Sequence, residues 1–284
     1  MPTKLLLLLL TFTTVSNVAQ TNSENYFSAE SRLKFGNQLY RTQDYLRALE
    51  EFKETLKLND NDTIRFRYAN CFLRIGRYVE ASQNFKTLFV SSDLREEAKL
   101  LFHESNFLQK DFQSFRSLYE SKIYFSHKYS RNLEQLNSIS YFLDNSTLPN
   151  ENQLLQPFDD SVQSKLAHFY QMKKFPQLKS PLTAALLSAV VPGAGKIYSG
   201  ELTDGLIALG ATALSVFMAV NNFQNDHQFR GWVFTGLSAF FYGGSVYGSA
   251  AAAQIYNAKF QMTLDSEINI YFESKNYFLP KIDF

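Results

Sequence analysis

The sequence predicts an all-α protein: a short helical solenoid followed by a glycine-rich transmembrane helical hairpin. Small and aromatic residues recur about every 33 positions between residues 30 and 89, a period typical of stacked helical pairs. Only five of the charged residues lie between residues 180 and 258, whereas ten of the 12 glycines lie between residues 193 and 248. A polar repeat region is therefore joined to an apolar region.

Composition excludes several kinds of site. The net charge is +1 and the pI is about 7.7, which removes an overall electrostatic argument for nucleic-acid binding. The single cysteine, Cys71, excludes an intramolecular disulfide and a cysteine-ligated zinc or iron–sulfur centre. The four histidines stand alone, without partners at metal-ligand spacing. We expect no catalytic residues, metal, cofactor or nucleic-acid partner.

Residues 1–20 have the order of an export signal peptide. Lys4 precedes an apolar run at residues 5–10, and small residues follow near Ala19, which gives a charged end, an apolar centre and a cleavage region. Asn17 does not suit the small-residue pattern of a cleavage site, so an uncleaved anchor helix is the alternative. Export of a chain with one cysteine indicates a bacterial cell envelope protein with a periplasmic repeat region.

The repeat region is expected at residues 21–178. Residues 35–56 have the spacing of two antiparallel helices joined by a turn near residues 42–44, and adding 33 to each position gives a second copy. Small residues at the helical contact allow close approach, and large ones fill the space between the helices. The matched pairs are Gly36/Ala69, Asn37/Asn70, Leu39/Phe72, Gln43/Gly76, Tyr45/Tyr78, Ala48/Ala81 and Phe52/Phe85.

This pattern resembles the tetratricopeptide repeat over residues 30–89. A third copy, at residues 102–119, is weaker because Phe115 stands where the first two copies have alanine. Helical patterning continues to residue 175, with breaks at Pro149 and Pro157. We expect seven to nine helices stacked as a short solenoid, because one repeat cannot bury its own apolar face.

The resemblance also implies a binding surface. In the family, the first helix of each repeat lines a concave groove that binds peptides or partner proteins. The positions that match are Asn37, Arg41, Asn70 and Arg74, which would hold an acidic or C-terminal peptide through charge-assisted hydrogen bonds. The alternative is that all four are ordinary solvated positions of a repeat.

The membrane region is expected at residues 179–258. Residues 205–225 and 231–258 carry no charge, and each stretch is long enough to cross a bilayer. The apolar stretch at residues 180–191 is too short to cross and suits a re-entrant or interfacial helix. A buried helix pair of a soluble protein is the alternative. Small residues at four-residue spacing in the last stretch would pack within the hairpin, or bind a second copy through the face of Gly244 and Gly248.

A Pro-Gly turn precedes the hairpin. Its motif consists of Pro192, Gly193, Gly195, Lys196, Tyr198 and Gly200. Over residues 180–256 the chain resembles the TM2-like two-helix modules of bacterial membranes and a related uncharacterised envelope family. The resemblance implies topology without catalytic residues. A phosphate-binding loop does not fit, because Val190 replaces the first glycine and Ile197 replaces the serine or threonine that must reach magnesium.

The C-terminal tail is expected at residues 259–284. Residues 267–272 and 276–279 are β-prone and predict a small C-terminal β-hairpin. Lysines flank the predicted spans, so positive-inside counting conflicts with an exported repeat region. That conflict leaves three spans open as the alternative to two spans with a re-entrant helix.

Two functions fit these features. The first is a non-enzymatic, membrane-anchored adaptor whose exported repeats bind a protein partner, with membrane lipid around its hairpin. The alternative is an accessory factor for membrane-protein assembly or transport, which acts through the hairpin itself.

Overall fold

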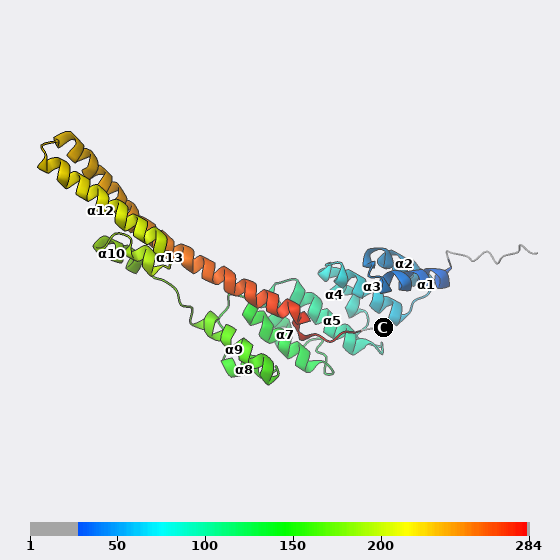
Figure 1. The fold of residues 1–284 in the computed structure, drawn as a ribbon. Helices are drawn as coiled ribbons and strands as arrows, with labels where there is room; N and C mark the ends of the chain where they lie inside the picture. The colour runs from blue at the N-terminus through cyan, green and yellow to red at the C-terminus, as the bar shows by residue number, and fades with distance from the viewer. Residues whose placement is uncertain (1–27, 283–284) are drawn as a thin grey trace, which may run out of the picture. The chain divides into compact units, whose positions relative to one another are not determined.

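The structure, a computed structural model, describes residues 28–282, and all of their secondary structure is helical (Figure 1). The predicted signal peptide lies outside the described residues. Two compact units divide the described chain: residues up to Asn137 together with those from Pro280 form the first, and Ser138–Leu279 form the second. The repeat region expected at residues 21–178 therefore includes the first unit's helices and the first helices of the second.

The first unit consists of helical pairs that follow the expected period. α1, α3 and α5 begin at residues 29, 62 and 95, and α2, α4 and α6 begin at residues 45, 78 and 112. The bounds are α1 Ala29–Arg41, α2 Tyr45–Leu58, α3 Asp62–Arg74, α4 Tyr78–Lys86, α5 Arg95–Leu108 and α6 Phe112–Glu120. The third pair, weak in sequence, keeps the same spacing within one residue.

The turn inside each pair has the same conformation. Gln43, Gly76 and Lys110 all have positive φ, at 63°, 80° and 62°. Asp44 and Asp111 then cap the second helix of their pairs by accepting a backbone hydrogen bond three residues on, which satisfies one of the unpaired amides at a helix start. The turn predicted near residues 42–44 is confirmed, and the structure repeats it twice.

The core of the first unit lies where the period places small and aromatic residues. Ala48, Phe52, Ala81 and Phe85 are fully buried. Gly36 allows the helices to touch, because a Cβ there would lie 3.0 Å from Cε1 of the Phe52 ring. In the third pair the structure accommodates Phe115 instead of alanine by packing its ring edge-on against Phe107, 5.4 Å between centroids.

The second unit contains shorter helices followed by two long ones. α7, Ser130–Leu143, crosses the unit boundary, so nine helices precede residue 178 in the described chain, as expected. The remaining bounds are α8 Glu151–Leu155, α9 Asp160–Lys174, α10 Pro181–Val190, α11 Ala194–Tyr198, α12 Leu202–Gln224 and α13 Gln228–Ser274, with a 3₁₀ turn at Asn276–Phe278. α12 and α13 pack side by side (Figure 1).

The prediction of a β-hairpin in the C-terminal tail is wrong. Residues 267–272 belong to α13, and residues 276–278 form the 3₁₀ turn. Leu264, Ile268 and Phe272 are buried at four-residue spacing, which is the period of a helix face. The Phe272 ring lies 5.8 Å from that of Phe142. Tertiary packing of this face therefore overrides the β propensity of isoleucine, tyrosine and phenylalanine.

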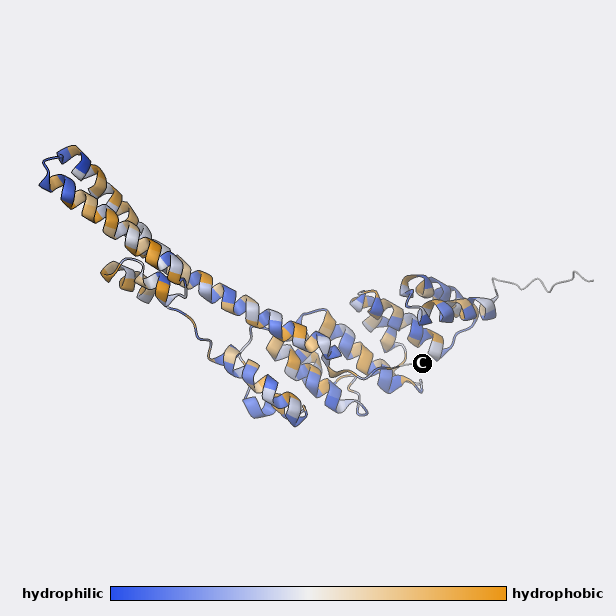
Figure 2. Ribbon diagram, viewed as in Figure 1, coloured by the Kyte–Doolittle hydropathy of each residue, from blue (hydrophilic) through white to orange (hydrophobic). Residues whose placement is uncertain are grey.

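The apolar helices differ from the expected pair of spans. Among the described residues, only α12 is long and apolar enough to cross a membrane; the second expected span lies inside α13, which does not meet that standard. α13 is a 47-residue helix, and its N-terminal half mixes apolar residues with glycine, serine and tyrosine. Figure 2 shows hydrophobic colour along α10, α12 and the adjoining part of α13, with a polar α12–α13 connection.

We expect Ala81→Phe to destabilise the first unit by about 1–3 kcal/mol or more, because the fully buried contact has no space for a ring. Thermal unfolding of the full-length protein in detergent, followed by circular dichroism, measures the change. Val79→Phe, at an exposed position of the same helix, is the matched control. An unchanged midpoint for Ala81→Phe would contradict the repeat register.

Candidate functional site

The residues predicted to line a groove lie on α1 and α3 of the first unit. Arg41 and Arg74 are exposed, Asn37 is half-buried and Asn70 is only 1% exposed. The Oδ1 atom of Asn37 accepts a hydrogen bond of 2.6 Å from Nη1 of Arg67. The 33-residue period suggested that the two asparagines are equivalent and free to bind a peptide. The structure differs, because each asparagine side chain already makes a hydrogen bond within the repeats.

Asn70 connects the first two repeats. Its Nδ2 atom donates a 2.5 Å hydrogen bond to the hydroxyl of Tyr40 on α1. Burial raises the pKa of Tyr40 to about 12, while the nearby Arg74 guanidinium acts in the opposite direction. The repeat pattern does not indicate Tyr40 or Arg67, since only the tertiary contact between α1 and α3 makes them partners of the asparagines.

Two buried polar atoms on α3 have no partner in the described chain. They are Oδ1 of Asn70 and Nε of Arg67. An unmade hydrogen bond costs about 1–3 kcal/mol for a buried group, so native structures rarely leave one without a water or ligand. One acceptor and one donor are thus unsatisfied within the repeats, on the same helix as the exposed guanidinium of Arg74.

Glu104 extends this group of side chains to the third repeat. It is buried on α5, and burial raises its pKa to about 7, against the opposing effect of the Arg74 guanidinium. Arg74 therefore acts on groups from α1 and from α5. We name Tyr40, Arg67, Asn70, Arg74 and Glu104 the groove cluster; it joins the first helices of three successive repeats.

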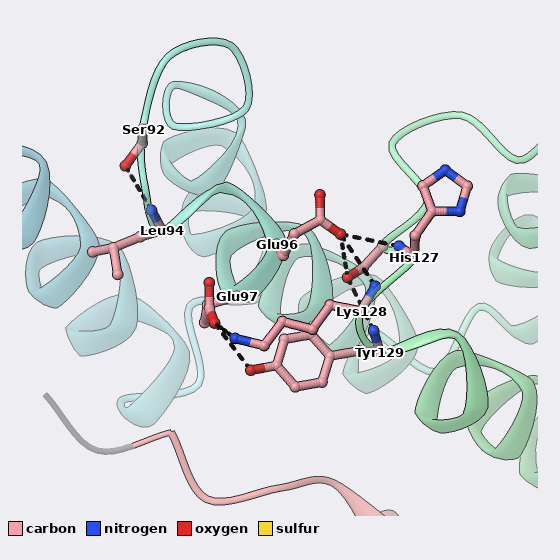
Figure 3. Close-up of polar contacts among 8 residues, drawn as sticks. Ser92, Leu94, Glu96, Glu97, His127, Lys128 and Tyr129 are labelled. Carbon is pink, nitrogen blue, oxygen red and sulfur yellow. Dashed lines mark hydrogen bonds and ion pairs between the residues drawn. The ribbon is translucent and has the colours of Figure 1, made fainter.

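A second polar contact fixes the segment after α6. Figure 3 shows Glu96 and Glu97 pointing from the start of α5 toward His127, Lys128 and Tyr129. Glu96 Oε2 accepts from Oγ of Ser126 at 2.9 Å and from the backbone of His127 at 3.0 Å. Burial would raise the pKa of Glu96, but hydrogen bonds from the side chains of Lys99 and Ser126 and from the backbone of Lys128 hold it at about 2.

Glu97 completes this contact by pairing with Lys128 and accepting from the Tyr129 hydroxyl at 3.1 Å (Figure 3). Oε2 of Glu96 and Oε1 of Glu97 both accept hydrogen bonds from residues 126–129. The acidic pair is therefore structural, and it fixes the chain that leads from the third repeat into α7.

In the second unit, the Pro-Gly turn closes a short helical hairpin. α10 ends at Val190, the chain turns at Pro192 and Gly193, and α11 runs back. The two ends meet, since the backbone N–H of Ser180 donates to the hydroxyl of Tyr198 at 3.3 Å. Gly200, at a φ of 92°, then ends α11 before α12 starts.

Serine hydroxyls satisfy the buried backbone of this turn. The N–H of Gly193 donates to Oγ of Ser245 at 2.7 Å, and the N–H of Gly195 donates to Oγ of Ser188 at 2.9 Å. Ser188 and Ser249 hydroxyls lie 2.6 Å apart, and Ser249 donates to the Ser245 carbonyl at 2.8 Å. Because Ser249 uses its proton on that carbonyl, Ser188 donates to Ser249.

The two glycines of the turn are required by close backbone contacts. A Cβ at Gly195 would lie 1.8 Å from the carbonyl oxygen of Ala184. A Cβ at Gly193 would lie 2.0 Å from the carbonyl oxygen of Gly205, and Gly193 also has a φ of 88°. The motif therefore packs α11 directly against α10 and α12, which accounts for its spacing without a phosphate ligand.

Basic and aromatic residues gather where this hairpin begins and ends. The backbone N–H of Lys179 donates to Asn257 Oδ1 at 2.8 Å, and Asn257 Nδ2 returns a 2.8 Å bond to the Lys179 carbonyl. The Lys179 ammonium lies 4.7 Å from the centre of the Tyr198 ring and 5.6 Å from that of Tyr256. Lys196 lies instead beside Gly248, where a Cβ would be 3.2 Å from its Cε.

This last contact bears on the predicted self-association face. Gly248 is covered by Lys196 of the same chain, while a Cβ at Gly244 would meet no atom within 4 Å. Ser245, Ser249 and Ala253 are buried within the unit. Most of the small-residue stripe is therefore used inside the chain, and association through Gly244 stays a prediction.

The described residues contain no group of three or more histidine, cysteine, aspartate or glutamate side chains that could hold a metal ion. Cys71 is buried, and burial raises its pKa to about 12. Comparison with protein-family models, curated proteins and solved structures gave no match to this chain. The two family resemblances drawn from the sequence therefore stay predictions.

We expect Gly193→Val and Gly195→Val each to destabilise the second unit by about 3 kcal/mol or more, because backbone must move to admit the new side chain. Gly210→Val is the matched control, since nothing lies within 4 Å of a Cβ there. Lys196→Ala should be milder. Thermal unfolding in detergent ranks the stabilities of the four variants. A normally folded Lys196→Ala variant that alone fails to bind the protein partner would favour a phosphate-binding loop instead.

Glu104→Gln is expected to stabilise the protein at pH 8 and to have little effect at pH 4. The folded pKa of about 7 lies above the ordinary value of 4.5, so the stability linked to protonation is complete below pH 4.5 and is lost as the pH rises through 7. The gain at pH 8 should be on the order of 2–3 kcal/mol. Unfolding midpoints at the two pH values measure it, with exposed Glu120→Gln as the control; equal effects at both pH values would contradict it.

Proposed function

We propose that this protein is a membrane-anchored adaptor whose exported helical repeats bind an acidic or C-terminal peptide of a protein partner, while α10–α13 hold it in the membrane of a bacterial envelope. The proposal that α10–α13 anchor the protein in a membrane rests on the exposure of apolar side chains around α12. Only 17% of its most apolar stretch is buried, whereas a core helix of a soluble domain buries most of its apolar surface. Such a surface suits lipid.

Exposed apolar residues also cover the neighbouring helices. On α10 and α13 they include Leu182, Leu186, Val190, Phe229, Trp232, Val233, Phe240 and Tyr247. Trp232 and Tyr256 stand about 36 Å apart along a helix of ideal rise, which suits residues at the two interfaces of a bilayer with a core about 30 Å thick. We therefore propose that α12 and the first half of α13 cross together as the hairpin.

The Pro-Gly turn fits this arrangement as a re-entrant element. The α10–α11 hairpin begins and ends beside Tyr198, and its turn contacts Ser245, which is near the middle of the proposed crossing. Non-helical backbone is tolerated at that depth only where protein buries and satisfies it. The serine hydroxyls on Gly193 and Gly195 supply those hydrogen bonds.

The groove cluster supports the adaptor half of the proposal. The exposed guanidinium of Arg74 lies on the same helix as two buried, unsatisfied atoms, Oδ1 of Asn70 and Nε of Arg67. A peptide carboxylate would pair with the guanidinium of Arg74. Arg41, exposed at the end of α1, would add a second cation for an acidic residue.

The alternative is an accessory factor for membrane-protein assembly or transport that acts through the hairpin. One observation favours it: Gly210, Gly236, Gly243 and Gly244 have nothing within 4 Å of a Cβ position. In lipid, unfilled glycine surfaces allow a second helix to approach closely. Under this alternative the repeats serve only as a platform.

A random peptide library with free C-termini, panned on the full-length protein in lipid nanodiscs, tests the adaptor function. We expect acidic sequences to be enriched, and Arg74→Ala together with Arg41→Ala to reduce that enrichment about tenfold, because charge-assisted hydrogen bonds are lost. Arg47→Ala is the matched control: it lies on the second helix of its pair, and it loses only an exposed ion pair with Asp44. Equal enrichment by wild type and the double variant would favour the alternative.

A further inference from the structure

The second unit contains a pocket that neither the repeats nor the Pro-Gly turn explains. Its volume is about 430 Å³, and it lies between the segment after α7, the end of α9 and the C-terminal third of α13. That size falls in the range of ligand sites. The residues that carry its chemistry are Ser146, Lys173, Lys174 and Asp265.

Both lysines keep donors for a ligand. Nζ of Lys173 donates to the carbonyl of Phe142 at 2.8 Å, and Nζ of Lys174 donates to the Tyr170 hydroxyl at 2.8 Å. An ammonium group has three donors, so these bonds leave further N–H groups on each lysine. The Lys174 ammonium also lies 5.0 Å from the centre of the Tyr170 ring and 5.7 Å from that of Phe175. Both lysines line the pocket, so their remaining donors are the groups that would meet an anion there.

The same pocket carries negative charge and an open hydroxyl. Burial lowers the pKa of Lys173, and the carboxylates of Asp265 and Asp144 oppose that effect, so acidic groups stand close to the lysine. Oγ of Ser146 is buried without a hydrogen-bond partner in the described chain. A ligand that suits the pocket therefore combines an anion with an N–H cation.

An apolar cavity continues from this pocket toward the proposed membrane surface. It has a volume of about 290 Å³ and shares Met172, Phe260 and Leu264 with the pocket. Tyr256 lines its other end, and the charged side chains of Lys259 and Glu267 also line it. An acyl chain attached to a ligand in the pocket would have an apolar path along α13 to the aromatic and lysine cluster around Lys179.

The depth of the pocket also suits a lipid headgroup. Phe260 and Asp265 follow Tyr256 by about 6 and 14 Å along α13. The interfacial region adds roughly 5–8 Å on each side of the hydrocarbon core. If Tyr256 marks the edge of the core, the pocket begins within the headgroup layer.

We propose that this pocket binds the headgroup of a zwitterionic phospholipid with a primary ammonium, that is, phosphatidylethanolamine; the inference rests on the proposed membrane insertion. The phosphate contacts Lys173 and Lys174, and the ammonium donates to Asp265 and Ser146. Phosphatidylglycerol has no ammonium group to pair with Asp265. Phosphatidylcholine has a quaternary ammonium and cannot donate an N–H bond to the carboxylate or to the hydroxyl.

Native mass spectrometry of the full-length protein released from mixed-lipid nanodiscs tests the proposal. The nanodiscs contain equal amounts of phosphatidylethanolamine, phosphatidylglycerol and phosphatidylcholine, and the lipid that stays bound is counted. We expect retention of phosphatidylethanolamine to exceed that of the other two about tenfold, as one or two charge-assisted bonds provide. Equal retention of all three lipids would overturn the proposal.

Two variants separate the halves of the headgroup. Lys173→Gln should lower retention of every phospholipid, whereas Asp265→Asn should lower retention of phosphatidylethanolamine alone and remove its preference over phosphatidylglycerol. Lys165→Gln on α9 and Glu273→Gln on α13 are controls two turns outside the pocket. Asp265 is exposed, so its variant is expected to fold normally; an unchanged lipid preference in Asp265→Asn would overturn the assignment.

Soluble O-phosphoethanolamine distinguishes a lipid from a free headgroup. We expect it to compete with the bound lipid only at millimolar concentration, because it lacks the acyl chains that fill the apolar cavity. Tight binding of the soluble compound without retention of lipid would show that the pocket takes a free headgroup compound and would contradict the proposal that its ligand is a phospholipid. A protein that inserts into nanodiscs without lipid preference contradicts this inference alone, whereas failure to insert contradicts the proposed function and this inference with it.

Discussion

The satisfied backbone of the Pro-Gly turn is the constraint on which the second unit depends. The start of α11 leaves buried amides without intrahelical partners, and those of Gly193 and Gly195 would be costly without acceptors. Ser245 and Ser188 provide them. Because these hydroxyls reach the turn only when α11 lies directly against α10 and α13, hydrogen bonding and close glycine contact require each other. Three neighbouring helices are fixed by this one arrangement.

The first unit depends on a simpler constraint, the matching of small and large residues across each helical pair. Its polar groups are then free for other contacts. The acidic start of α5 shows one use, since Glu96 holds the 126–129 segment by accepting several donors at once. The groove cluster shows another: Arg74 acts on groups from α1 and α5, so one exposed cation connects three repeats electrostatically.

In the proposed setting, the two units present opposite kinds of surface. Repeats expose charge and bury rings, whereas α10 and α12 expose large apolar side chains and bury small ones such as Ala184 and Ser188. Water favours the first distribution and lipid the second, because helices in lipid associate through close packing and hydrogen bonds. The pocket near Lys173 combines both characters, with charge at one end and an apolar path at the other.

The sequence by itself determined the helical class, the 33-residue period, the turn at residues 42–44 and the end of α10 before Pro192, because each depends on local spacing or on one residue's backbone preferences. Tertiary structure decided the rest. It extended α13 through the β-prone tail, since Leu264, Ile268 and Phe272 share a buried face. It also engaged Asn37 and Asn70 with Arg67 and Tyr40, and it placed the lysines of α9 across from Asp265. These contacts join residues far apart in the chain, and their geometry exists only once the helices have packed.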